Sequence, residues 1–137
     1  MNSQPKIVIS SADAERLDRM LEDLPERAFA GKEDLEAELE RAEIVDPSRM
    51  PPTVVTMNST VRFAVEGSAE EKTLTLVYPR DANTQAGRIS VLTPVGSALL
   101  GAAQGDAIDW PKPGGGMLRV RIREVVYQPE RAALHSR

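Results

Sequence analysis

Two glycines five residues apart, Gly96 and Gly101, are the first residues whose spacing suggests chemistry. A Walker-type phosphate loop needs glycine, four residues, glycine, and then lysine and a hydroxyl residue. Here Ala102 and Ala103 occupy the lysine and hydroxyl positions. No side chain remains to contact a phosphate or to hold magnesium. We therefore reject a nucleotide-binding loop at this place.

The same stretch has the signals of a short helix. Thr93 suits a helix N-cap, Pro94 suits the first helical position, and Gly101 suits the position after the last turn. Residues 88–92 before it read as a strand. The sequence therefore predicts a strand, a corner and a short apolar helix.

Histidine or cysteine chemistry has little support. His135 is the only histidine, and it stands in residues 128–137, which we expect to be partly disordered. A catalytic triad or a His-ligated zinc site needs a rigidly held imidazole. The chain has no cysteine, which excludes disulfides and thiolate metal sites. We expect no catalytic residue, no metal site and no cofactor.

Charged residues surround the expected turn of an N-terminal helical hairpin. They are Glu26, Arg27, Glu33 and Asp34. Paired carboxylates at such a tip could hold a magnesium ion loosely. The simpler interpretation is a charged, solvated turn, which we favour because exposed turns are usually polar.

Three arginines alternate along the last expected strand, at Arg119, Arg121 and Arg123. Alternation places them on one face. An RNA-binding face would carry aromatic residues between them, and none is present. With 17 basic and 21 acidic residues the net charge is −4, which also argues against nucleic acid and favours a protein partner with a basic surface. We expect these arginines to pair with carboxylates on a neighbouring strand.

The first third of the chain predicts two amphipathic helices. A short strand at 6–9 precedes Ser10 and Asp13, which have capping-box spacing. Apolar residues then recur at helical spacing up to residue 24, and a second helix is expected over 33–44. A short connection makes an antiparallel hairpin, or short coiled coil, the expected arrangement.

The rest of the chain predicts an α+β domain. Three prolines within residues 46–52 indicate a break. Strands are expected at 53–57 and 60–65, joined by a turn at Asn58 and Ser59, and further strands are expected at 72–78, 88–92 and 117–127. We divide the chain into a hairpin (1–47), a linker (48–52), a mainly antiparallel sheet domain with one short helix (53–128) and a tail (129–137).

Localisation follows from what the sequence lacks. No apolar run approaches the ~20 residues of a membrane span, and the first residues do not resemble a secretory signal. We expect a cytoplasmic protein that does not bind membranes, and we expect a monomer.

Several stretches together resemble a known family. "AERLDRMLE", "PPTVVTMNSTVRF", "TLVYP", "TPVGSALLG" and "YQPE" are similar to the Rnk family, the regulators of nucleoside diphosphate kinase, over nearly the full length. Residues 54–127 also resemble the C-terminal domain of the Gre transcript-cleavage factors. The features that carry this second resemblance are an Ile-Ser pair, a Thr-Pro pair, a short apolar helix and a Gly-Asp pair.

The resemblance implies an FKBP-like fold for the sheet domain and a role in bacterial transcription. It implies binding to RNA polymerase near the secondary channel, with the hairpin directed into the channel. The positions that match the Gre docking loop are Leu92, Thr93, Pro94 and Val95. The Gre tip motif is not recognisable, so the resemblance implies a non-enzymatic factor that competes with Gre factors without stimulating cleavage.

Two alternatives stay open. The family name implies an effect on nucleoside diphosphate kinase, either direct or through its expression. The chain could also be a true transcript-cleavage factor that recruits magnesium through Glu26, Glu33 or Asp34.

Overall fold

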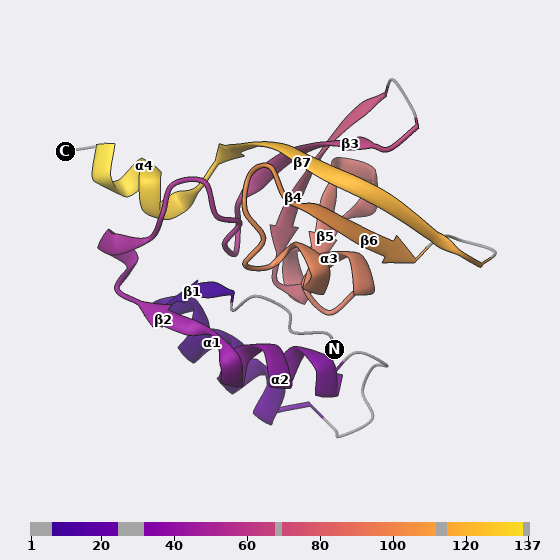
Figure 1. The fold of residues 1–137 in the computed structure, drawn as a ribbon. Helices are drawn as coiled ribbons and strands as arrows, with labels where there is room; N and C mark the ends of the chain where they lie inside the picture. The colour runs from indigo at the N-terminus through magenta and orange to yellow at the C-terminus, as the bar shows by residue number, and fades with distance from the viewer. Residues whose placement is uncertain (1–6, 25–31, 68–69, 112–114, 136–137) are drawn as a thin grey trace.

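The computed structural model describes residues 7–24, 32–67, 70–111 and 115–135 (Figure 1). The elements follow in the order β1 (Val8–Ser10), α1 (Ser11–Glu22), α2 (Lys32–Arg41), β2 (Glu43–Val45), β3 (Thr60–Val65), β4 (Glu71–Val77), β5 (Arg88–Ser90), α3 (Pro94–Leu99), β6 (Ala107–Pro111), β7 (Met117–Tyr127) and α4 (Pro129–His135). Short 3-10 turns lie at Pro47–Arg49, Pro79–Asp81 and Thr84–Ala86. The expected α+β combination of helices and a sheet is confirmed.

The N-terminal unit contains a strand that the sequence did not predict. The second helix, expected over 33–44, ends at Arg41, and β2 then pairs in parallel with β1. Ile44 lies opposite Ile9 in this pairing. Apolar residues at helical spacing reach only Ala42, and β-branched residues follow, which favour a strand when a partner is available.

A five-stranded sheet forms the second part, in the order β5-β4-β3-β7-β6. β3 pairs antiparallel with β4 and β7, β6 pairs antiparallel with β7, and β4 pairs in parallel with β5. The sheet is therefore mainly antiparallel, as expected.

The prediction of a β-hairpin that turns at Asn58 and Ser59 is wrong. Residues 53–57 do not pair with β3, and Val55 instead exchanges backbone hydrogen bonds with Gly101 and Ala102. The turn itself exists, since Asn58 has a φ of 66° and the Thr56 N–H donates to Ser59 Oγ at 2.9 Å. Because residues 53–57 are held by the segment after α3, the chain enters β3 without forming a hairpin.

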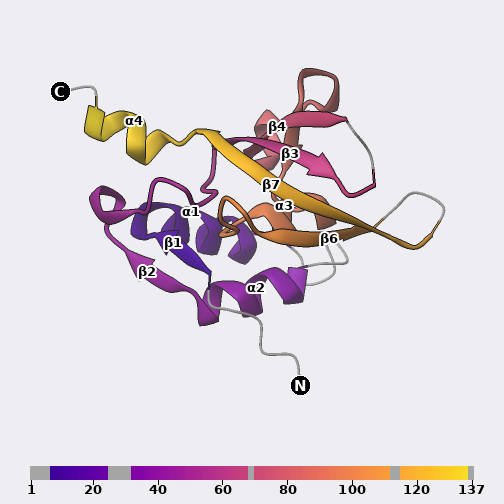
Figure 2. The same cartoon turned by 45° about the horizontal axis from the view of Figure 1, so that its top comes forward.

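One hydrophobic core joins the helices to the sheet. Leu17 and Leu21 of α1 and Leu35 of α2 are buried in the same cluster as Phe63 and Leu76 of the sheet. Figures 1 and 2 show both helices against the sheet domain on the same side as α3. The N-terminal helices therefore pack on the domain and share its core.

The C-terminal residues contain a helix that the sequence did not predict. Residues 128–137 were expected to be partly disordered, but α4 occupies Pro129–His135. Gln128 is fully buried, and its Nε2 donates to the carbonyls of Pro51 and Val54, both at 2.8 Å. This amide ties the end of β7 to the segment expected as a linker. Among the described residues, no helix is long and apolar enough to cross a membrane.

Candidate functional site

A hydrogen-bonded corner connects β5 to α3. The Ser90 carbonyl accepts from the Thr93 N–H at 3.1 Å and from Thr93 Oγ1 at 2.8 Å. Ser90 Oγ accepts from the Leu92 N–H at 3.1 Å, and Thr93 Oγ1 accepts from the Gly96 N–H at 3.0 Å. The predicted N-cap at Thr93, and Pro94 at the start of the helix, are both confirmed. The corner is thus fixed by local bonds before any partner arrives.

Gly96 allows this corner to close. A Cβ atom at Gly96 would overlap the Ser90 carbonyl oxygen and would lie 2.9 Å from Val91 Cα. Gly101 has a φ of 80°, which suits a residue after a helix end. Gly96 therefore lies inside α3, in its first turn, and the prediction that both glycines bracket the helix is wrong for Gly96, whereas Gly101 follows the helix end as expected.

The predicted docking residues lie along this corner. Leu92, Thr93 and Val95 are half-buried, and Pro94 is the first residue of α3. Leu92 and Val95 also pack against the hydrophobic core. Each is therefore held from inside the domain and partly accessible from outside it.

Leu92 also borders a groove with a volume of about 590 Å³. The groove lies between α1 and the 3-10 turn that follows β4. Its lining residues are Arg16, Met20, Leu24, Tyr78, Pro79, Arg80, Asp81 and Leu92. Leu92 therefore belongs both to the corner and to the groove, and α1 forms one wall of that groove.

Asp13 lies close to this groove in a buried polar cluster, with only 8% of its surface exposed. Its carboxylate accepts from the Met57 N–H at 3.2 Å and from the Tyr78 hydroxyl at 3.5 Å. Burial, together with the nearby Glu130 carboxylate, raises the pKa of Asp13 to about 6. Burial and the Asp13 charge raise the pKa of Tyr78 to about 12. Asp13 therefore links α1 to the sheet domain at an electrostatic cost.

Replacing Asp13 with asparagine is expected to stabilise the protein at neutral pH. The folded state holds a proton on Asp13 between the usual pKa of 3.8 and about 6, whereas the unfolded state does not. Stability of the unaltered chain therefore falls as pH rises through this window, by at most about 3 kcal/mol. The asparagine side chain keeps an acceptor for the Met57 N–H and carries no charge. Urea unfolding at pH 4 and pH 7.5 measures the difference.

The matched control is Asp18→Asn, since Asp18 is exposed on the same helix. We expect Asp18→Asn to change stability by less than about 0.5 kcal/mol at both pH values. Equal stability of Asp13→Asn and the unaltered protein at pH 7.5 would show that the buried carboxylate carries no such cost.

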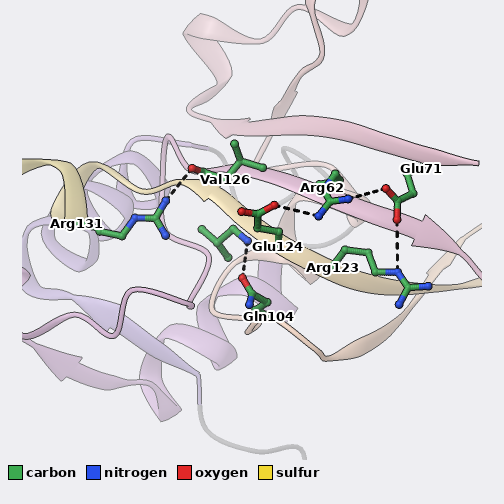
Figure 3. A network of polar contacts seen from close by, with 8 residues as sticks. Arg62, Glu71, Gln104, Arg123, Glu124, Val126 and Arg131 are labelled. Atoms are coloured by element: carbon green, nitrogen blue, oxygen red, sulfur yellow. Dashed lines mark hydrogen bonds and ion pairs between the residues drawn. The ribbon is translucent and has the colours of Figure 1, made fainter.

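An ion-pair network covers the outer face of the sheet (Figure 3). Arg62 of β3 contacts Glu71 at 2.7 Å and Glu124 at 3.0 Å, and Arg123 contacts Glu71 at 3.7 Å. Arg119 contacts Asp109 of β6 at 3.4 Å, and Arg121 donates to the Gly105 carbonyl at 2.9 Å. Pairing with carboxylates is confirmed for Arg119 and Arg123, so two of the three cations are neutralised locally.

The predicted tip residues are only partly placed. Glu26 and Arg27 lie outside the described residues, while Glu33 and Asp34 belong to the first turn of α2. In the part of the chain that the structure describes, no three acidic or histidine residues gather where they could hold a metal ion.

The groove could not be predicted from the sequence because its walls come from segments that are far apart in the chain. The helical spacing of apolar residues up to residue 24 predicts the buried face of the first helix, but it assigns no role to Met20 or Arg16. Met20 was the one sequence signal for the groove, because it is an apolar residue that lies beside the buried face of the first helix. Within the segment 78–81, only residue 78 had an expected role, as the end of the strand at 72–78.

Comparisons with known proteins give two family matches and close relatives. Residues 5–45 match the "Rnk N-terminus" family, and residues 50–127 match "Transcription elongation factor, GreA/GreB, C-term". The chain is 46% identical over 136 residues to the "Regulator of nucleoside diphosphate kinase" of Escherichia coli (strain K12), covering 95% of this chain and 96% of that protein. It is 37% identical over 125 residues to the "Transcription elongation factor GreA" of Methylobacterium sp. (strain 4-46), covering 82% and 77%.

A solved structure has the same fold. It is a prokaryotic transcription elongation factor GreA/GreB from Nitrosomonas europaea. The TM-score is 0.80 at 69% sequence identity, and the match covers 90% of this chain and 100% of the other.

Proposed function

The chain belongs to the Rnk family, with an Rnk N-terminus followed by a GreA/GreB-type C-terminal domain, and from this membership we propose that it regulates transcription by binding RNA polymerase near the secondary channel. Its relatives are named as regulators and elongation factors, so the broad role is that of a Gre-related transcription factor. Binding to polymerase, competition with Gre factors and the absence of cleavage are the specific parts of the proposal.

The observation that carries the proposal is the rigid corner at residues 92–95. Four hydrogen bonds among Ser90, Leu92, Thr93 and Gly96 fix the backbone, and Leu92 remains half-exposed. A surface that is already ordered loses little conformational entropy on binding. We propose that Leu92, Thr93, Pro94 and Val95 contact the polymerase.

The short helices favour occlusion of the channel over cleavage. α1 has 12 residues and α2 has 10, which correspond to about 18 Å and 15 Å of helix. Both helices use their apolar faces in the shared core. We propose that the hairpin, with Glu26, Arg27, Glu33 and Asp34 near its turn, points toward the channel and blocks other factors without catalysing cleavage.

Further parts of the proposal extend the family assignment. We propose an FKBP-like fold for residues 53–128, separated by residues 48–52 from the hairpin unit of 1–47 and followed by 129–137. The E. coli relative is named for nucleoside diphosphate kinase, and we propose an indirect link to that enzyme through transcription. We also propose that the chain acts as a monomer.

A two-part experiment tests this function. Fluorescently labelled protein is titrated with bacterial core RNA polymerase, and unlabelled protein is added to a backtracked elongation complex. We expect saturable binding and no transcript shortening beyond the protein-free reaction. Lack of binding would refute the proposal. Cleavage that disappears after Glu26→Ala, Glu33→Ala and Asp34→Ala are combined would establish the alternative of a true cleavage factor.

A further inference from the structure

The residue that follows the end of α3 lies against the segment that leads into β1. A Cβ atom at Gly101 would overlap Ile7 Cβ, and it would lie 2.9 Å from Ile7 Cγ2 and 3.2 Å from Ile7 Cδ1. A φ of 80° by itself would also admit asparagine. The close approach of Ile7 is stricter, because every residue other than glycine carries a Cβ atom. Ile7 therefore sits on the bare α carbon of Gly101.

Ile7 is attached to both helices of the N-terminal unit. It directly precedes β1, which leads into α1, and its carbonyl accepts from the Glu43 N–H of β2 at 2.8 Å. Its side chain is half-buried and packs against the hydrophobic core. Because β2 closely follows α2, a displacement of Ile7 would move both helices together.

The other side of this contact is fixed by the sheet domain. The Gly101 N–H donates to the Val55 carbonyl at 2.9 Å, and the Val55 N–H donates to the Ala102 carbonyl at 2.8 Å. Two residues further along, the Met57 N–H donates to the Asp13 carboxylate of α1 at 3.2 Å. One short backbone segment therefore joins the end of α3 to a second contact with the N-terminal unit.

These two contacts constrain the N-terminal helices more tightly than the shared core does. The helices contribute Leu17, Leu21 and Leu35 to that core. Aliphatic side chains can repack in several arrangements of similar free energy, so a unique arrangement is lost before stability is. A side chain pressed against a backbone and a directional hydrogen bond permit fewer arrangements. The contact of Ile7 with Gly101 and that of Asp13 with Met57 therefore define the angle of the helices to the domain.

We propose that Gly101 is a positioning residue, which seats Ile7 and thereby sets the direction of α1 and α2 relative to the corner at residues 92–95. The corner and this seat stand at opposite ends of the six-residue helix α3, about 9 Å apart along its axis. The consequence for polymerase rests on the function proposed above, because the hairpin must point toward the channel when the corner docks.

The test measures the direction of the helices in the folded protein, by electron–electron double resonance between two nitroxide labels. The labels are attached at Glu40→Cys on α2 and Lys72→Cys on β4, since both positions are exposed and the chain has no other cysteine. In this background Ile7→Gly removes the seated side chain, and Gly101→Ala fills the seat. We expect each change to shift or broaden the distribution of label distances.

The matched control is Gly105→Ala, four residues beyond the seat. Gly105 has a φ of 96°, and nothing lies within 4 Å of an added Cβ. The control therefore has the strain of a left-handed residue without a collision, so its unfolding constant should rise about tenfold and its label distances should not change. Gly101→Ala should raise the unfolding constant at least about tenfold further. Combined with Ile7→Gly, it should cost about tenfold less than the two single effects multiplied together.

The outcomes separate the seat from its consequence for polymerase. Unchanged label distances in folded Gly101→Ala and in Ile7→Gly, or strictly independent effects in the double variant, would overturn the seat. If Gly101→Ala does not fold, the distances in Ile7→Gly decide. Ile7→Gly should need about five times more protein to inhibit Gre-stimulated cleavage, because a smaller fraction of molecules has the competent direction, while Gly105→Ala should stay within about twofold.

Inhibition by Ile7→Gly that equals that of the unaltered protein, with shifted label distances, would overturn the consequence for polymerase. If the unaltered protein does not inhibit cleavage, the proposed function fails, and the label distances still decide whether Gly101 positions the helices.

Discussion

Replacement of Gly96 with alanine is expected to destabilise the protein by about 3 kcal/mol, although alanine normally stabilises a helix over glycine by about 1 kcal/mol. The sign is reversed because the new Cβ atom would overlap the Ser90 carbonyl oxygen and lie 2.8 Å from its carbonyl carbon. Both neighbours are backbone atoms of the β5 end, so relief requires α3 to move away from the sheet.

This movement would also disrupt the corner. Thr93 Oγ1 accepts from the Gly96 N–H and donates to the Ser90 carbonyl, so it would lose one or both partners. We expect Gly96→Ala to lower polymerase affinity by about tenfold or more in addition to its effect on stability. Urea unfolding with linear extrapolation measures the first effect, and anisotropy with core polymerase measures the second.

The matched control is Gly67→Ala in the turn between β3 and β4. Gly67 has a φ of 84°, and nothing lies within 4 Å of an added Cβ. Its alanine variant should lose only about 1–2 kcal/mol, from backbone strain, and should keep full polymerase affinity. Gly96→Ala that proves more stable than the unaltered protein would contradict the close approach of α3 to β5.

The corner could be predicted from sequence because its signals are local. Thr93, Pro94 and Gly101 have the preferences of a helix N-cap, a first turn and a position after the helix end. Each of these preferences acts within a few residues, so the local sequence is enough to predict where the helix begins and ends. The same holds for the start of α1, where the expected cap is present and Ser10 Oγ accepts from the Asp13 N–H at 3.1 Å.

The groove and the Asp13 cluster could not be predicted in this way. Asp13 was interpreted as part of a local capping box, but its carboxylate reaches Met57 and Tyr78, which are 44 and 65 residues away. Similarly, β2 exists because β1 offers it a partner, which no local pattern around Ile44 reveals. The groove, the Asp13 contacts and β2 all depend on packing between distant segments, and local residue preferences carry no information about that packing.

Replacement of Leu92 with aspartate is expected to abolish most of the competition with Gre factors. Leu92 is the residue that the corner and the groove share, so a carboxylate there would be buried against apolar partner surface without compensation. Loss of a central, desolvated anchor side chain reduces the binding free energy of an interface by about 2 kcal/mol or more, which corresponds to about a 30-fold change in affinity. The matched control is Ile44→Asp, since Ile44 is 48% exposed on β2 and does not line the groove. Both variants are first checked by thermal unfolding at the assay temperature.

The most direct measurement of the central claim is displacement of a Gre factor from core polymerase, followed as inhibition of Gre-stimulated cleavage in a backtracked complex. The account predicts that the unaltered protein and Ile44→Asp inhibit cleavage in parallel titrations, and that folded Leu92→Asp requires about 30 times more protein. Cleavage that is unaffected by excess unaltered protein, or inhibited equally by Leu92→Asp, would contradict docking through the corner at residues 92–95.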